Sequence, residues 1–279
     1  MMEGMPEETA PNPSYVRIER GLGPHARVAV VHFERGDRLN ALSLDAMRQL
    51  RDAARSFDDD PTTTAVVLTG TAASFSAGAD LADATRRTTE PLGLSERRHM
   101  LRVGPDMCAA WERMRPITIA AIEGFCIGGG AALAVSLDFR TCGAGAHFRI
   151  PEVGLGMNMS WGSLPRLLHL LGPARTKQVV ILASERVGAS DALAWGLVEN
   201  VVPDGTAFEA AFEFAQRVAS QPPVTVEMTK RSVNALAGAL DDLAAHMDLD
   251  QYALTTTSED FREGVAAFRE RRVPEFRGR

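Results

Sequence analysis

Cysteine is scarce in this sequence. The 279 residues hold three cysteines, Cys108, Cys126 and Cys142, which are odd in number and widely separated. They resemble neither a disulfide framework nor a CxxC metal clip. The six histidines form no HxH or HExxH pattern, so a structural zinc site is not expected. We therefore expect no bound metal.

Basic residues are also fewer than acidic ones. The chain has 30 basic and 36 acidic side chains, a formal net charge of −6 and a pI of about 5.6. Because sequence-independent nucleic-acid binding needs clustered positive charge, the composition argues against a nucleic-acid partner. Hydrophobic residues at 45% and charged residues at 24% are ordinary for a globular protein. The length fits one large domain, or one domain with an appendage.

No signal peptide is recognisable at the start of the chain. Residues 1–14 contain Pro6, Pro11 and Pro13 with three glutamates and no apolar core, so we expect a flexible tail there. The weakly charged stretch 117–137 has the length of a membrane span. A glutamate and three consecutive glycines near its middle instead favour a strand, a turn and a buried helix. The sequence therefore predicts a cytoplasmic protein without a membrane span.

Hydrophobic patterning predicts an α/β core followed by a helical region. Short apolar runs at 28–33, 65–69 and 117–122 are typical of buried strands. Helical spacing of apolar residues follows Ser43 as far as Phe57, and again from Ser95 to Met114. Residues 71–80 form a loop of small residues, and the pattern from about 164 to 272 is almost wholly helical. We expect a core over 15–205 and a helical C-terminal region over 206–279.

Two short motifs do not fit their structural context. Gly21–Ala26 has the G-x-G-x-x-A form of a dinucleotide fingerprint, but a polar tail precedes it and a strand follows. Residues 158–162 approach the G-x-S-x-G elbow of serine hydrolases, yet Asn158 stands in place of the first glycine. No phosphate-binding P-loop is present. Dinucleotide binding and serine hydrolysis are therefore not expected.

Two glycine loops are the stronger candidates for a site. FSAGADL occupies 75–81 after the strand at 65–69, and GFCIGGG occupies 124–130 between a strand and an alanine-rich helix. Each loop places backbone N–H groups at the carboxyl end of a strand. Two such donors aimed at one oxygen would make an oxyanion hole. The spacing alone favours the simpler interpretation, two tight turns.

The order of motifs resembles the crotonase (enoyl-CoA hydratase/isomerase) family. The residues that carry the resemblance lie along residues 15–275: RLNAL at 38–42, FSAGADL, EGFCIGGG, IPEVGL at 150–155 and GASDALAWGLV at 188–198. The resemblance implies a fold of repeated ββα units. It also implies fatty acid metabolism, and a C-terminal helical region that packs into homotrimers or dimers of trimers.

The same resemblance implies roles for individual residues. The N–H groups of Ala79 and Gly129 would polarise a thioester carbonyl, and Glu152 would be the catalytic acid/base. No separate cofactor is implied, because coenzyme A is part of the acyl-CoA substrate. Asp80, judged alone, is more typical of a helix cap. The residues expected to bind substrate or its CoA portion are Arg38, Leu39, Ala41, Ala77, Ala79, Asp80, Leu81, Gly128, Gly129, Ser160 and Trp161.

Two positions depart from the family pattern. Hydratases of this family hold the attacking water with two glutamates, and the first of them corresponds here to Ala132. Ser160 stands where some relatives place an aspartate, and serine is a poor base without an activator. One carboxylate with an oxyanion hole favours isomerisation of a 3-enoyl thioester to the 2-enoyl form. The alternatives are 2-enoyl-CoA hydration, and a non-catalytic protein that only binds acyl-CoA.

Overall fold

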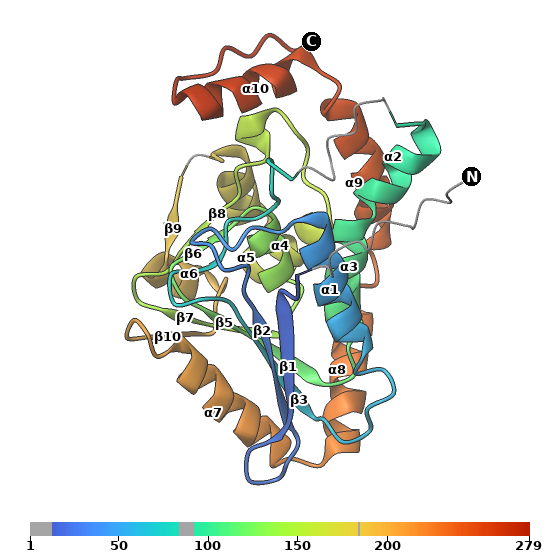
Figure 1. Cartoon of the computed structure of the whole chain (residues 1–279), viewed down its shortest axis with the longest axis vertical. Coiled ribbons are helices and arrows are strands. Elements are labelled where there is room, and N and C mark those ends of the chain that lie inside the picture. The colour runs from blue at the N-terminus through green and yellow to red at the C-terminus, as the bar shows by residue number, and fades with distance from the viewer. Residues whose placement is uncertain (1–12, 84–91, 184) are drawn as a thin grey trace, which may run out of the picture.

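The strands form two β-sheets in the computed structural model, which describes residues 13–83, 92–183 and 185–279 (Figure 1). From β3 to β8, successive strands alternate between the two sheets. The first sheet has six strands in the order β1-β2-β3-β5-β7-β10, and the second has four in the order β4-β6-β8-β9. The six-stranded sheet consists of β1 (Val16–Leu22), β2 (Val28–Phe33), β3 (Ala65–Thr69), β5 (Ile117–Ile122), β7 (Phe139–Gly143) and β10 (Asn200–Val202). The four-stranded sheet consists of β4 (Ser74–Ser76), β6 (Phe125–Ile127), β8 (His147–Arg149) and β9 (Val187–Gly188).

Each pair of strands from the two sheets leads into a helical segment, which confirms the expected ββα repeat. The helices of the core are α1 (Leu44–Arg55), α2 (Leu94–Leu101), α3 (Val103–Arg113), α4 (Gly129–Ala134), the 3-10 turn η2 (Val153–Leu155), α5 (Ser163–Ile181) and α6 (Ala189–Trp195). Apart from the antiparallel pairs β1·β2 and β8·β9, neighbouring strands run parallel. The carboxyl ends of β3 and β5 therefore lie at the same edge, where both glycine loops begin.

The central strands β2, β3, β5 and β7 of the six-stranded sheet are buried on both faces, which explains their continuous apolar runs. In β2, Val28 and Val30 pack into one hydrophobic cluster and Ala29 and Val31 into the other. The helix α7 (Ala207–Ala219) covers the first face through alanines at every fourth position, all buried. Glu123 accepts a hydrogen bond from the first N–H of α7 at 3.0 Å and so caps that helix. The other face packs on α1, α3 and the second sheet.

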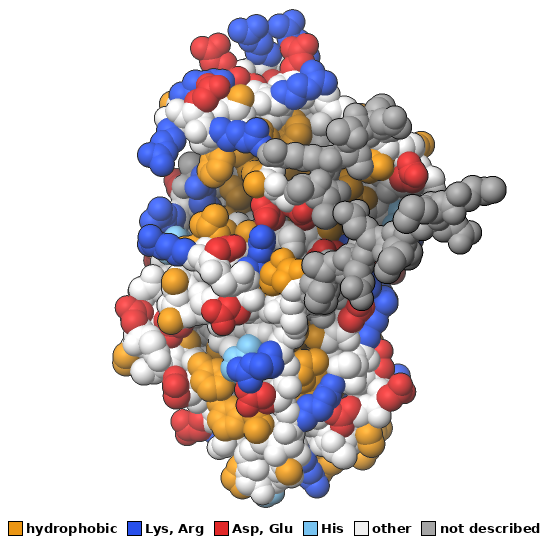
Figure 2. Space-filling view, in the orientation of Figure 1, with side chains coloured by type: hydrophobic (Ala, Val, Ile, Leu, Met, Phe, Trp, Pro, Cys, Tyr) orange, Lys and Arg blue, Asp and Glu red, His pale blue; other side chains and the backbone are white. Residues whose placement is uncertain are grey.

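The C-terminal helices extend beyond the sheets, as Figure 1 shows. They are α8 (Pro223–Ala237), α9 (Asp242–Thr255) and α10 (Glu259–Glu270). Basic and acidic side chains intermingle over α10 at the top of the molecule (Figure 2). Ion pairs account for part of this mixture, since Arg272 pairs with both Glu263 and Glu270. No helix in the described ranges is long and apolar enough to cross a membrane.

Several predicted boundaries are corrected. Residues 16–22, expected to be part of a polar approach to Gly21–Ala26, form β1, so Gly21 lies in that strand and Gly23 begins the turn of a β-hairpin. The loop expected at 71–80 contains β4, and the single helix expected from Ser95 to Met114 is divided at Arg102. The helical stretch from 164 contains β9 and β10, which at two and three residues are too short to show a periodic pattern. The expected tail lies outside the described residues except for 13 and 14.

Candidate active site

The two glycine loops meet at the amide groups of Ala79 and Gly129. Leu42 donates its N–H to the carbonyl of Gly78 at 2.7 Å and accepts from the N–H of Asp80 at 3.0 Å. In such a parallel bridge, the N–H of the intervening Ala79 must point away from Leu42. A Cβ placed on Gly129 would lie 3.3 Å from the Ala79 nitrogen. In the described part of the chain neither N–H has an acceptor, so both are available to one bound oxygen.

Glycine is required where the loops touch. Gly78 has a φ of +84°, and a Cβ there would come within 2.5 Å of the Ile127 carbonyl oxygen and 2.9 Å of the Gly129 nitrogen. Gly128 also has a positive φ, of +53°, immediately before α4. Any side chain at these positions would strain the backbone and push the loops apart. The glycine spacing in the sequence thus sets the distance between the two amides.

Glu152 supplies the carboxyl group of the site. It follows β8 and Pro151 and begins the turn η2, and its Oε1 would lie 3.1 Å from a Cβ on Gly128. The residue as a whole is half-buried, but Oε2 is fully buried and has no hydrogen-bond partner within the described residues. Burial raises the pKa of Glu152 from 4.5 to about 7, against the weaker effects of a backbone hydrogen bond and the Arg149 cation. A carboxyl group with that pKa can both accept and return a proton near neutral pH.

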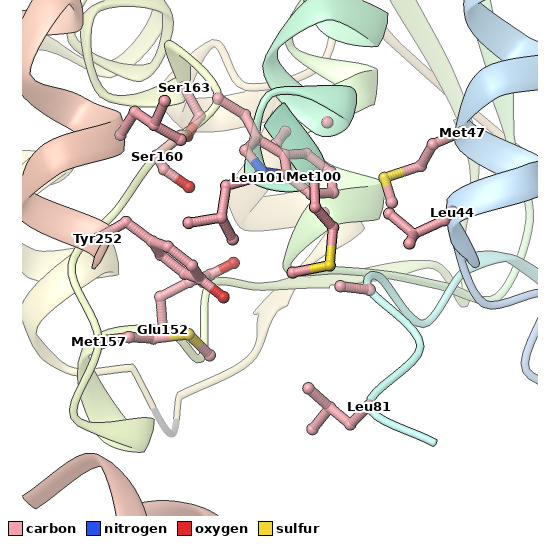
Figure 3. Close-up of a pocket in the computed structure, with 16 residues that line it drawn as sticks. Leu44, Met47, Leu81, Met100, Leu101, Glu152, Met157, Ser160, Ser163 and Tyr252 are labelled. Carbon is pink, nitrogen blue, oxygen red and sulfur yellow. The ribbon is translucent and has the colours of Figure 1, made fainter. Parts of the chain in front are cut away.

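A pocket of about 80 Å³ joins these groups. Glu152, Met157 and Tyr252 lie on one side of it, and Leu44 and Met47 lie on the other (Figure 3). Among the predicted site residues, the pocket brings together Ala79, Leu81, Gly129, Glu152, Ser160 and Trp161. Its remaining lining residues are Leu44, Met47, Met100, Leu101, Gly104, Ala132, Met157, Ser163, Leu249 and Tyr252.

The two positions that depart from the family pattern both face this pocket. Ala132 presents a methyl group, which neither orients water nor carries a proton. Ser160 presents a hydroxyl group that points into the cavity (Figure 3). Among the described residues, the pocket is therefore lined by one carboxylate, that of Glu152, and otherwise by mostly apolar side chains.

The other predicted residues lie beside the pocket rather than in it. Arg38 and Leu39 are exposed, and the carbonyl of Leu39 accepts the N–H of Ala77 at 2.8 Å. The Arg38 guanidinium makes no ion pair with any described residue. The backbone of 38–42 therefore runs along that of 77–80 and forms a ledge next to the two amides, which is exposed at Arg38 and Leu39. Ala41 belongs to this ledge and Gly128 to the glycine loop at 124–130, and both are buried.

Asp80 lies shortly before residues 84–91, which are outside the described part of the structure, so its expected role as a helix cap stays a prediction. Its Oδ2 accepts a hydrogen bond from Arg35 at 2.7 Å, and its Oδ1 accepts from the N–H of Ala82 at 2.8 Å. The first helix described after it, α2, begins at Leu94. Asp80 therefore holds the loop that carries Ala79.

Three residues of α9 contribute to the site, although no sequence pattern predicts them. Leu249 and Tyr252 line the pocket, and buried Asp248 accepts the N–H of Gly162 at 3.0 Å. Burial raises the pKa of Asp248. No motif marks these residues, and the helix that carries them lies far along the chain from the glycine loops. Only the packing of α9 against α2 and α5 brings them to the pocket.

The fold has the arrangement of crotonase-type proteins, and comparison with known proteins agrees. Residues 23–279 match the family model described as enoyl-CoA hydratase/isomerase. A crotonyl-CoA hydratase of Syntrophomonas wolfei is 33% identical over 256 residues, covering 91% of this chain and 96% of that protein. A short-chain-enoyl-CoA hydratase of Clostridium acetobutylicum is 32% identical, covering 90% and 94%. A crystal structure of a carnitinyl-CoA hydratase from Mycobacterium avium superposes with a TM-score of 0.81 at 32% identity, covering 95% and 99%.

The chain belongs to the enoyl-CoA hydratase/isomerase family, and it is an enzyme of that family. Its fold is the α/β crotonase fold with a helical C-terminal region.

Proposed function

We propose that this enzyme binds an enoyl-CoA thioester with its carbonyl oxygen at the N–H groups of Ala79 and Gly129, and that Glu152 transfers the proton. The observation that carries the proposal is the buried Oε2 of Glu152, without a hydrogen-bond partner, in the same pocket as two amides that have no acceptor. Two convergent donors favour the charge that develops on an enolate oxygen, and one donor typically contributes about 10²–10³ in rate.

The preferred reaction is isomerisation of a 3-enoyl thioester to the 2-enoyl form. Ionised Glu152 removes a proton from C2, and the electron pair moves onto the thioester oxygen as a dienolate. Glu152 then returns the proton to C4, and the double bond ends between C2 and C3. One carboxylate is enough for this sequence, because it accepts and returns the same proton. Ala132 supports isomerisation over hydration, since its methyl group cannot hold an attacking water.

Hydration of a 2-enoyl thioester is the second candidate. The two relatives described above are named hydratases, and the Ser160 hydroxyl faces the pocket and could hydrogen-bond a water. The oxygen of that water would add to C3 while Glu152 takes one of its protons, and Glu152 would then deliver a proton to C2 of the resulting enolate. Serine lacks the charge that activates water in a two-carboxylate site, so this reaction should be the slower one.

The CoA portion would lie on the ledge formed by 38–42 and 77–80. Arg38 would meet its phosphate groups, because its guanidinium has no ion-pair partner among the described residues. No further cofactor is needed, since the thioester supplies the acidity at C2.

We also propose that residues 206–279 are the trimerisation region of a homotrimer or a dimer of trimers. Large exposed apolar side chains on α8 and α9 support this, since patches of this kind mark association surfaces. These side chains include Val224, Met228, Val233, Leu236, Leu243 and Leu254. Light scattering should then give a mass three or six times 30.1 kDa.

Parallel assays with a 2-enoyl-CoA and a 3-enoyl-CoA test the reaction. We expect the 3-enoyl substrate to be converted faster, and Glu152→Gln to abolish turnover while the protein still binds acyl-CoA. Glu209→Gln, on the exposed face of α7, is the matched control and should leave both rates unchanged. Faster hydration than isomerisation would overturn the preference. Tight binding with no turnover from either protein would favour the non-catalytic alternative.

A further inference from the structure

Trp161 holds a backbone conformation that a tryptophan rarely adopts. Its φ is +64°, in the left-handed region that favours glycine. Its indole ring fills a slot between two helical glycines. A Cβ on Gly104 of α3 would clash with the ring, and a Cβ on Gly129 of α4 would come within 2.6 Å of it. The ring therefore fits between α3 and α4 only because both positions lack a side chain.

The surrounding structure holds this conformation from both sides. The Trp161 carbonyl accepts a hydrogen bond from Arg166 at 2.7 Å, and Arg166 is itself fixed by two hydrogen bonds to Glu112, at 2.8 and 2.7 Å. On the other side, Asp248 accepts the N–H of Gly162. A strained residue persists only when its neighbours over-determine it, and such residues cluster at functional sites.

The ring stands beside the group that would bind the thioester oxygen. Gly129 carries one of the two amide donors, and the ring packs against its Cα on the pocket side. An acyl chain that starts at this oxygen meets the indole within its first few carbons. The pocket volume also indicates room for only a short acyl chain. At about 80 Å³ it is roughly half of the 150 Å³ engineered cavity that accepts a benzene ring.

We propose that Trp161 is the end wall of the acyl pocket and limits the substrate to short, unbranched acyl groups of about four carbons. The limit rests on the proposed binding of an acyl-CoA at Ala79 and Gly129, but not on which reaction follows. Trp161 acts by excluding carbons beyond the wall. The slot formed by Gly104 and Gly129 would become pocket volume if the ring were removed.

Calorimetric binding of saturated acyl-CoA thioesters, which cannot react, tests the wall. For the wild type we expect butyryl-CoA to bind at least 10-fold more tightly than octanoyl-CoA. Trp161→Gly keeps the positive φ favourable while it removes the ring, so it should erase this difference or reverse it. Trp161→Phe keeps a ring and should retain most of the selectivity. Trp195→Phe, on α6 outside the pocket, is the control and should leave the profile unchanged.

The outcomes separate the wall from the proposed function. Equal affinity of the wild type for butyryl-CoA and octanoyl-CoA would overturn the wall whether or not the variants fold, and so would an unchanged profile in folded Trp161→Gly. A chain-length limit that persists while Glu152→Gln retains full turnover would refute only the proposed proton transfer. Failure of every acyl-CoA to bind would refute both.

Discussion

Arg35 Nη1 lies 2.7 Å from Asp80 Oδ2, and the same nitrogen donates to the Ala41 carbonyl at 3.1 Å. The guanidinium thereby joins the segment that carries Ala79 to the neighbouring segment of the ledge. Both side chains are largely buried, at 18% exposure each, so the ion pair is less screened than one on the surface. The ion pair fixes the loop at Asp80, next to Ala79, whose N–H is a proposed donor to the thioester oxygen.

Asp80→Asn should therefore lower kcat without a comparable change in KM. The amide weakens the charge-assisted bond to Arg35, and a displacement of Ala79 by a fraction of an ångström misaligns its N–H. We expect a loss of about 10-fold in kcat, measured by steady-state kinetics. Asp45→Asn, which removes a surface pair with Arg48, is the matched control. Unchanged kinetics in Asp80→Asn would show that the pair does not position the site.

The rate should depend on pH through Glu152. The proposed base acts when ionised, and its pKa is raised to about 7. The ratio kcat/KM for isomerisation should therefore fall about tenfold per pH unit below 7 and level off above it. A pH series on the wild type measures this directly. A rate that rises as the pH falls would assign Glu152 the role of an acid in the first step.

The raised pKa of Glu152 also predicts that the stability of the folded protein depends on pH. An unfolded Glu152 ionises near 4.5, whereas the folded one ionises near 7, so its contribution to stability is greatest below about pH 4.5 and declines as the pH rises to 7. Glu152→Gln removes the buried charge and should be more stable than the wild type by up to about 3 kcal/mol at pH 8. Near pH 4 the difference should vanish. Urea unfolding at the two pH values measures both, and an equal difference at each would contradict the burial of the charged form.

Ala132→Glu should restore part of a two-carboxylate site. A second carboxylate in the same pocket as Glu152 can hold and deprotonate water, so the ratio of hydration to isomerisation should rise by at least about 10-fold. Ala132→Gln has nearly the same shape and no basic group, and it should leave that ratio low. The two products can be followed in one assay. Equal ratios in the two variants would mean that the carboxylate at this position does not decide the reaction.

Much of the fold was readable in the sequence, because buried parallel strands leave continuous apolar runs. The strands at 28–33, 65–69 and 117–122 and the helix from Leu44 were predicted on this basis, and the structure has them. The strands β4, β6, β9 and β10 were missed, since two or three residues with glycine or polar neighbours show no period. Their pairing partners lie elsewhere in the chain, so only tertiary contacts stabilise them.

The site, like the fold, could be predicted from the sequence only in part. The glycine motifs and the resemblance placed Ala79, Gly129 and Glu152 among the candidates, and the structure brings all three to one pocket. The contributions of Asp248 and Tyr252 were missed, because they depend on how α9 packs rather than on a local pattern. Gly104 has no functional signature either. Its significance is visible only when the ring of Trp161 is seen against it.

The residues that α9 contributes to the site determine when the enzyme can become active during its synthesis. Both amide donors and Glu152 leave the ribosome well before Asp248, which follows Glu152 by 96 positions (248 − 152). At about 5–20 residues per second, the nascent chain holds an unfinished pocket for roughly 5–20 seconds. During that interval the turn that carries Trp161 lacks its Asp248 anchor. Newly synthesised enzyme should therefore become active only after the last helices dock, and ribosome-bound chains stalled before α9 should be inert.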